Sequence, residues 1–148
     1  MYAILVIDDD DHVRTAIESI LTRKSFEVVV ARDGRAGLDI FKARKFDAVV
    51  IDIFMPEMDG FATLRALRRL DSSIPIVAMS GRAFTDPKDG APDFLSMAVK
   101  LGASRALQKP FRGDELVDAL LQCLAERDAP AGIAAQPVAA QQHFMRRT

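Results

Sequence analysis

Residues 3–11 read AILVIDDDD, an apolar run that ends abruptly in four aspartates. A second apolar run, residues 48–51, ends in the same way on Asp52. Continuous apolar runs are typical of parallel strands buried on both faces, and open α/β sheets place their sites just beyond the carboxyl ends of such strands. The two stretches therefore predict a parallel sheet with an acidic site at one edge.

The carboxylates of Asp8, Asp9 and Asp52 would converge if their two strands pair, because neighbouring strands lie about 4.8 Å apart. Each pair would then repel by about 3 kcal/mol, taking roughly 5 Å and an effective dielectric constant near 20. The sequence thus predicts that a cationic group lies among them.

Strand-like and helix-like patterns alternate along the rest of the chain, which is typical of βαβ units. Further strands are predicted at residues 27–31, 76–79 and 105–108. Amphipathic helices are predicted from near residue 11, around 37–41, after the turn at 59–60, around 94–101 and around 116–124. Gly102 is expected to end the fourth helix as a left-handed cap. The pattern predicts an α/β fold with five strands and five helices.

Composition excludes several classes of protein. The chain has 148 residues, 49% of them hydrophobic, and a formal charge of −1, so no global field attracts nucleic acid or a membrane. The single Cys123 excludes an internal disulfide, and neither a membrane span nor a secretory signal is visible. We expect a cytoplasmic protein with a folded domain over residues 1–127 and a disordered tail, rich in Ala, Pro and Gln, over residues 128–148.

Two further strand ends carry polar side chains, because Ser80 ends the fourth predicted strand and Lys109 follows the fifth. Carboxylate oxygens are hard ligands that suit Mg²⁺. The metal and Lys109 would neutralise phosphoryl oxygens, and the Ser80 hydroxyl would donate to another. Together with Asp8 and Asp9, these residues predict a phosphoryl-accepting site in which Asp52 is the nucleophile.

Each of these residues also has a purely structural interpretation. The four aspartates can cap a helix, which explains Asp11 better than a ligand role does. Ser80 can be a turn residue and Lys109 a solvated charge. Their joint placement at one edge of the sheet favours the site.

The chain resembles the receiver domains of two-component response regulators, in particular stand-alone, chemotaxis-regulator-like ones. The stretches that carry the resemblance are residues 6–10, 52–60, 80–81 and 107–111. The resemblance implies a flavodoxin-like, doubly wound sheet of five parallel strands in the order 2-1-3-4-5.

By the same resemblance, Asp52 is the phosphoacceptor, Asp8 and Asp9 bind Mg²⁺ or Mn²⁺, and Phe54 lends the metal its backbone carbonyl. Ser80 is the switch hydroxyl, Lys109 pairs with the phosphoryl group, the bond from Lys109 to Pro110 is cis, and Gly81 leaves room for phosphate.

The resemblance also implies the partners. A sensor histidine kinase or histidine phosphotransfer protein would donate the phosphoryl group. It would dock on the first helix, which carries Arg14 on its first turn, and an ordinary solvated face is an equal alternative there. A downstream protein would read the phosphorylated state. We expect no direct nucleic acid or membrane binding, a monomer or weak homodimer, and no enzymatic activity beyond the chain's own phosphorylation and dephosphorylation.

Three features depart from the family pattern. Ala106 stands where many relatives carry an aromatic switch residue, so Phe94 or Phe111 would have to take that role. Residues 82–92 form a longer connection than usual, which we expect to be mobile. The apolar Phe54 cannot orient an attacking water, so we expect slow autodephosphorylation, with Arg82 as a second modulator.

Two other functions remain as alternatives. One is a degenerate receiver that binds a partner without phosphorylation, which Ala106 and Phe54 would permit. The other is a hydrolytic phosphotransferase of the aspartyl-phosphate type, whose usual second acid, two residues after the nucleophile, is replaced here by Phe54.

Overall fold

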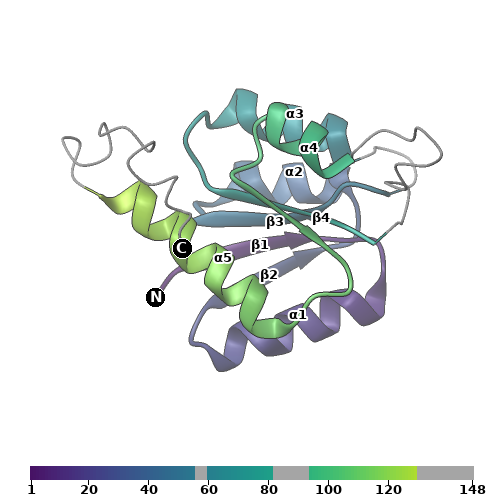
Figure 1. Cartoon of the computed structure of the whole chain (residues 1–148). Helices are drawn as coiled ribbons and strands as arrows, with labels where there is room; N and C mark the ends of the chain where they lie inside the picture. Colours follow the sequence, from purple (N-terminus) through teal and green to yellow (C-terminus); the bar gives the residue numbers. More distant parts are fainter. Residues whose placement is uncertain (56–59, 82–93, 130–148) are drawn as a thin grey trace.

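Strands and helices alternate throughout the computed structural model, which describes residues 1–55, 60–81 and 94–129 (Figure 1). The elements are β1 (Ala3–Ile7), α1 (Asp11–Arg23), β2 (Glu27–Ala31), α2 (Gly34–Ala43), β3 (Ala48–Asp52), α3 (Gly60–Leu70), β4 (Ile76–Ser80), α4 (Phe94–Lys100), β5 (Arg105–Gln108) and α5 (Gly113–Asp128). Residues 82–92 and 130–148 lie outside the described residues, so the mobile connection and the disordered tail stay predictions. The domain boundary at residue 127 also stays a prediction.

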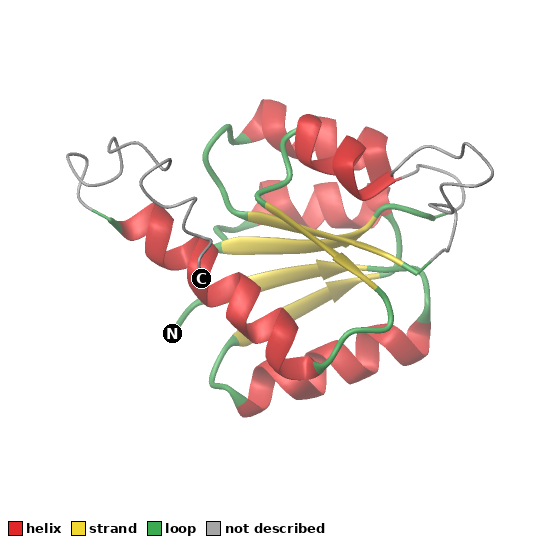
Figure 2. Cartoon of the chain, in the orientation of Figure 1, coloured by secondary structure: helices red, strands yellow, loops and turns green. Residues whose placement is uncertain are grey.

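The five strands form one parallel sheet in the order β2-β1-β3-β4-β5, which confirms the predicted order. Helices α1 and α5 cover one face of this sheet, and α2, α3 and α4 cover the other (Figures 1 and 2). This is the flavodoxin-like, doubly wound fold that the resemblance implies.

The central strands β1, β3 and β4 are buried at every position, because helices cover both of their faces. In β1, Ile4 and Val6 pack in the core beneath α1 and α5, whereas Leu5 and Ile7 pack beneath α2, α3 and α4. Burial of one large aliphatic side chain contributes about 1.5–3 kcal/mol. An uninterrupted apolar run therefore stabilises two cores at once.

The aspartates after β1 divide their roles differently from the sequence-based expectation. Asp10, not Asp11, is the N-cap of α1, and its Oδ1 accepts hydrogen bonds from the amides of His12 (2.8 Å) and Val13 (3.3 Å). The assignment of the cap to Asp11 was wrong, because only a residue with extended backbone, such as Asp10, can turn its side chain back to the first amides of the helix. Asp11 is already helical.

Arg68 of α3 ties the far end of α4 to the sheet. Its Nε donates to the carbonyl of Gly102 (2.9 Å), and its Nη1 donates to the carbonyl of Ile74 (2.6 Å). Gly102 has a φ of 120°, which confirms the predicted left-handed stop after α4. The turn between α4 and β5 is thereby held against the start of β4.

Polar contacts join the end of α5 to the starts of β1 and β3. The Tyr2 hydroxyl donates to Asp128 Oδ2 (3.0 Å), and Arg127 Nη1 donates to both the carbonyl and Oδ1 of Asp47 (3.1 Å each). Asp47 Oδ2 also accepts from the Ala3 amide (2.7 Å). The N-terminus and the end of α5 therefore lie together, on the left in Figure 1.

Among the described residues, no helix combines the length and the apolar character that crossing a bilayer requires.

Two glycines that face the sheet differ in what an added methyl group would meet. At Gly60 a Cβ would collide with the backbone of Asp52 and Ile53, whereas at Gly37 it would meet the flexible Ile7 Cδ1 at 2.5 Å. Because backbone cannot rotate away, we expect Gly60→Ala to lower the free energy of unfolding by about 2–3 kcal/mol. Gly37→Ala should cost less than about 1 kcal/mol, since helix propensity offsets the repacking. Urea denaturation of both variants measures this, and equal losses would contradict it.

Candidate functional site

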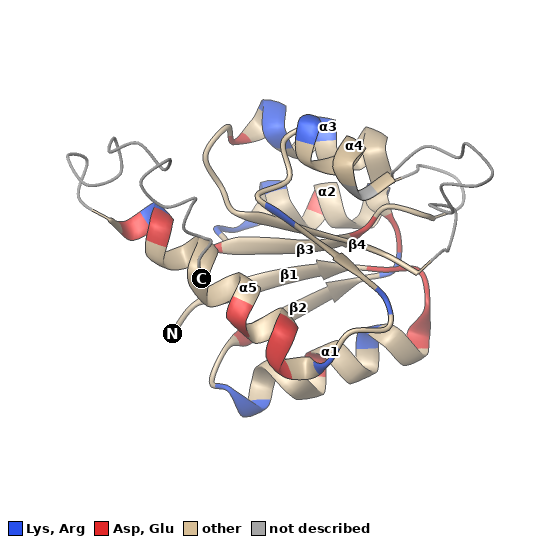
Figure 3. Cartoon of the chain, viewed as in Figure 1, with Lys and Arg blue, Asp and Glu red and all other residues tan. Residues whose placement is uncertain are grey.

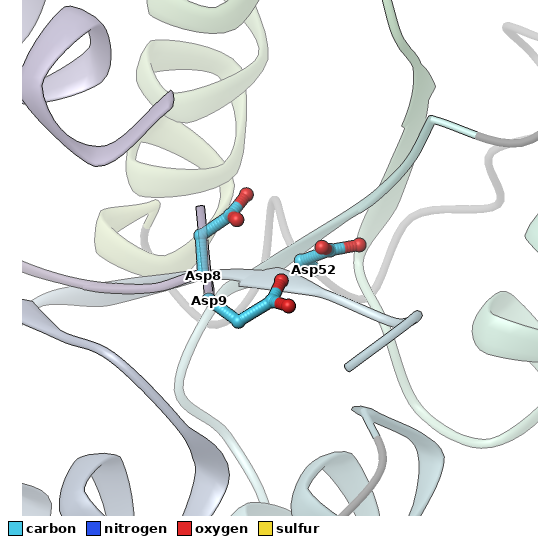
Figure 4. Close-up of side chains that lie close together, drawn as sticks. All are labelled: Asp8, Asp9 and Asp52. Carbon is cyan, nitrogen blue, oxygen red and sulfur yellow. The ribbon is translucent and has the colours of Figure 1, made fainter. Parts of the chain in front are cut away.

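Three carboxylates meet at the edge of the sheet where the strands end. Asp8, Asp9 and Asp52 each offer an oxygen, and these oxygens all lie within 4.8 Å of one another. Figure 4 shows the three side chains gathered where β1 and β3 end, pointing to the same side. Asp8 is fully buried and Asp52 is 5% exposed, whereas Asp9 is open to solvent.

Strand register explains why these residues converge. Ile7 of β1 pairs with Ile51 of β3, so Asp8, the first residue after β1, lies beside Asp52, the last residue of β3. Ser80 ends β4 at the same edge, opposite Gln108 of β5. One parallel register thus brings the carboxyl ends of four strands, β1, β3, β4 and β5, to one edge of the sheet. In Figure 3 this edge carries both acidic and basic segments of the chain.

Lys109 supplies the cation that the sequence required. Its Nζ lies 2.8 Å from Asp8 Oδ2 and 3.7 Å from Asp52 Oδ2, with the side chain 19% exposed. The Lys109 amide donates to the Ser80 carbonyl (2.7 Å), and the bond to Pro110 is cis, as expected. The lysine is therefore fixed by its own backbone as well as by the carboxylates.

The Asp52 carboxyl is electrostatically unusual. Burial raises its pKa to about 6, against the opposing effects of the Phe54 amide and Lys109. The Phe54 amide donates to Asp52 Oδ1 (3.1 Å), which fixes the rotation of the carboxylate. Water is largely excluded from Asp52, so its charged form depends on a nearby cation.

The donor set fits a hard divalent cation. One lysine faces three carboxylates, so negative charge exceeds positive charge at this edge (Figure 3). Mg²⁺ prefers carboxylate and carbonyl oxygens and keeps several waters, which the exposed Asp9 would admit. The Phe54 carbonyl, the fourth predicted ligand, stays a prediction.

Ser80 and Gly81 lie where the sequence placed them. Ser80 is buried at the end of β4. A Cβ on Gly81 would lie 3.3 Å from Lys109 Cδ, so the absence of a side chain at Gly81 makes room for the lysine stem. The room left by Gly81 was expected to serve phosphate access, and the lysine stem uses it as well.

Two phenylalanines near Asp52 contact each other. The Phe54 and Phe94 rings meet edge to face, with centroids 4.7 Å apart, and Phe61 lies 6.2 Å from Phe94. Phe94 is the first residue of α4, so a ring contact joins the segment after Asp52 to this helix. Phe111 instead packs on the other side of the sheet, against the core beneath α1 and α5.

Arg14 lies on the first turn of α1, as expected, and the docking role of this helix stays a prediction. The Arg14 side chain is only 16% exposed and turns back toward the acidic residues. Its Nη1 donates to the Asp8 carbonyl (2.7 Å). The spacing from Asp11 to Arg14, three residues along a helix, was the signal in the sequence that indicated a local ion pair.

Comparison with known proteins agrees with this geometry. The family described as response regulator receiver domain matches residues 4–121. Response regulator MprA of Mycolicibacterium vanbaalenii is 35% identical over 127 residues, covering 86% of this chain and 52% of that protein. Transcriptional regulatory protein PrrA of Mycobacterium leprae is 34% identical over 136 residues, which cover 92% of this chain and 55% of that protein. The chain thus spans about half the length of the curated relatives it matches.

Solved structures give the same result. A receiver domain protein from Clostridium thermocellum superposes with a TM-score of 0.76 at 26% identity, over 86% of this chain and 97% of that one. The receiver domain of the Francisella response regulator 1452 superposes with a TM-score of 0.73 at 27% identity, over 84% of this chain and 97% of that one. Since the family match extends from β1 into α5 and relatives of both kinds agree with it, the chain belongs to the response regulator receiver domain family of two-component systems.

Proposed function

We propose that Asp52 accepts a phosphoryl group from the phosphohistidine of a sensor histidine kinase or a histidine phosphotransfer protein, in a Mg²⁺-dependent reaction. The observation that supports this most directly is the surroundings of Asp52. Its carboxylate is buried, lies 3.7 Å from Lys109, and shares the sheet edge with the acidic pair Asp8 and Asp9. Phosphorylation on aspartate and Mg²⁺ binding are typical of the family to which the chain belongs.

The transfer makes one bond and breaks one. An oxygen of Asp52 attacks phosphorus while the bond from phosphorus to the histidine nitrogen breaks, and that nitrogen keeps the electron pair. The histidine leaves as neutral imidazole when its other nitrogen carries the proton. The Phe54 amide holds Asp52 Oδ1, Lys109 is placed to pair with a phosphoryl oxygen, and the Ser80 hydroxyl is proposed to donate to another.

The metal ligands in this proposal are Asp8, Asp9, Asp52 and the backbone carbonyl of Phe54. Mg²⁺, or Mn²⁺ in its place, supplies positive charge that neutralises the transferring phosphoryl oxygens. Lys109 already compensates Asp8, so the cation is needed chiefly to offset the charge of the buried Asp52 carboxylate.

The proposed output is phosphorylation-dependent docking to a downstream protein by a cytoplasmic regulator that is a monomer or a weak homodimer. A net charge of −1 gives residues 1–148 no general attraction to nucleic acid. The relative PrrA is named a transcriptional regulatory protein, but this chain spans only about half of it, so that role is not carried over. Apart from its own phosphorylation and dephosphorylation, no enzymatic activity is proposed.

One observation favours a second function. Ala106 offers no ring to turn inward, which is compatible with a degenerate receiver that binds its partner in one state only. Phosphorylation of Asp52 decides between the two.

Incubation with acetyl phosphate and Mg²⁺ should add one phosphoryl group to the wild-type chain and none to Asp52→Asn, because the amide is not a nucleophile. Intact-mass spectrometry measures the addition, and omission of Mg²⁺ should abolish it. Asp39→Asn, which removes an exposed carboxylate from α2, serves as the matched control and should be labelled as the wild type is. An unlabelled wild type, or labelling that survives in Asp52→Asn, would favour the degenerate receiver or another acceptor.

Stability without metal should depend on pH through Asp52. Folding raises the pKa of this carboxyl from 3.8 to about 6, so its ionised form costs stability. The cost is absent below the unfolded pKa near 4 and complete above about 6, where it reaches about 3 kcal/mol at most. In EDTA, Asp52→Asn should therefore be more stable than the wild type at pH 7.5, with the difference vanishing near pH 4. Urea denaturation across this range measures it, and a difference independent of pH would contradict the assignment.

The lifetime of the acyl phosphate should respond to Phe54. An Asn at this position can orient a water, so Phe54→Asn should dephosphorylate about tenfold faster, a change of about 1.4 kcal/mol in the barrier. Phe54→Leu removes the ring contact with Phe94 without adding a polar group, and it should leave the rate near that of the wild type. Loss of label over time measures both rates. Equal acceleration in the two variants would assign the effect to packing instead of water.

A further inference from the structure

The loop between β1 and α1 carries Asp8 and Asp9, and nearly every polar atom of Asp8 has a partner. The Asp8 amide donates to the Ala31 carbonyl (3.1 Å). Its Oδ1 accepts from the Asp10 amide (2.9 Å) and its Oδ2 from Lys109 (2.8 Å). These contacts hold the Asp8 side chain. None of them involves the carbonyl of the peptide group that joins Asp8 to Asp9.

Arg14 fixes that peptide group. Its Nη1 donates to the Asp8 carbonyl oxygen at 2.7 Å, while its Nη2 pairs with the Asp11 carboxylate. A hydrogen bond from a charged donor to a carbonyl is stronger than one between neutral groups. The guanidinium thus bridges the first residue after β1 and the first residue of α1, and it is mostly shielded from solvent.

Asp9 depends on this bridge more than Asp8 does. Its side chain is exposed, and no residue in the described part of the chain donates a hydrogen bond to its carboxylate. Neither packing nor a hydrogen bond therefore orients the Asp9 carboxylate. The carbonyl of Asp8 and the nitrogen of Asp9 share one rigid peptide plane, so holding the Asp8 carbonyl fixes the Cα of Asp9. The Asp10 amide, bonded to Asp8 Oδ1, holds the next peptide group, and the two contacts together set the direction in which the Asp9 side chain leaves the backbone.

We propose that Arg14 is a positioning residue for the divalent cation: by clamping the Asp8–Asp9 peptide plane, it aims the Asp9 carboxylate at the ion. The proposal rests on the proposed Mg²⁺ site. Arg14 contacts neither the acceptor nor the ion in this role, and it acts through Asp9 alone.

The sign of the effect separates positioning from simple electrostatics. Arg14 is a cation near an acidic cluster, so Coulomb repulsion alone predicts that its removal tightens Mg²⁺ binding. Loss of position predicts the opposite, since removal of groups that orient metal ligands typically weakens affinity by tenfold or more. We therefore expect Arg14→Met to bind Mg²⁺ roughly tenfold more weakly.

The experiment is a Mg²⁺ titration of the full chain, without phosphodonor, followed by isothermal calorimetry and amide chemical shifts. Arg14→Lys keeps the charge and one donor, and it should recover most of the lost affinity. Arg23→Met removes the same charge from the last residue of α1, where Arg23 donates to the Ser19 carbonyl, and it should leave the affinity unchanged. If Arg14→Met does not fold, Arg14→Gln takes its place.

A second measurement needs no metal. In EDTA, hydrogen exchange of the Asp10 amide, which donates to Asp8 Oδ1, should be faster in Arg14→Met than in the wild type, while amides of β4 are unchanged. Mg²⁺ affinity in Arg14→Met that equals or exceeds the wild type overturns the proposal. If exchange is faster in Arg14→Met but the wild type binds no Mg²⁺, Arg14 does hold the Asp8–Asp9 peptide group. The role of that contact in cation binding is then overturned, together with the proposed function.

Discussion

The contact between Lys109 and Asp8 is the interaction on which the rest of this site depends. It joins residues that are 101 positions apart, and it brings the segment after β5 against the segment after β1. Without a cation there, a fully buried Asp8 would lie beside Asp52, and only the amides of Asp10 and Phe54 would offset the loss of hydration. The lysine does not neutralise both carboxylates equally. Its Nζ lies 2.8 Å from Asp8 Oδ2 and 3.7 Å from Asp52 Oδ2, a difference of 0.9 Å. Burial therefore keeps the pKa of Asp52 raised in spite of Lys109, and further positive charge would favour its ionised form.

Most of the fold, and the edge at which the site lies, could be predicted from the sequence, because both follow from where apolar runs stop. Such a run in a buried parallel strand fixes the direction and the end of that strand, and the first polar residue after it must lie at the carboxyl edge. Asp8 and Asp52 were found in this way, whereas Lys109 was found from its place after the less apolar strand at residues 105–108. The same reasoning could not choose the helix cap among four consecutive aspartates, because the choice between Asp10 and Asp11 depends on one residue's backbone angles.

Contacts that a side chain makes outside its own helix or strand also could not be predicted from the sequence. Arg14 turns back over a full helical turn to reach a carbonyl, and Arg68 joins the turn after α4 to the start of β4. The edge-to-face contact of Phe54 with Phe94 requires knowledge of where α4 begins relative to β3. This contact links the segment after Asp52 to the same helix that Arg68 holds at its other end, whereas Ala106 on β5 provides no ring for such a link.

The pairing of Tyr2 with Asp128 and of Arg127 with Asp47 has a practical consequence for attachment. Both ends of the described domain lie at the amino edge of the sheet, and a strand of five residues, about 16 Å long, separates them from the carboxylates. A fluorophore, an affinity handle or a fused module joined at either end therefore sits at the opposite pole from the reactive edge. Tethering the molecule to a sensor surface at either end of the described domain, beside Tyr2 or Asp128, presents Asp52 outward, accessible to a large donor protein.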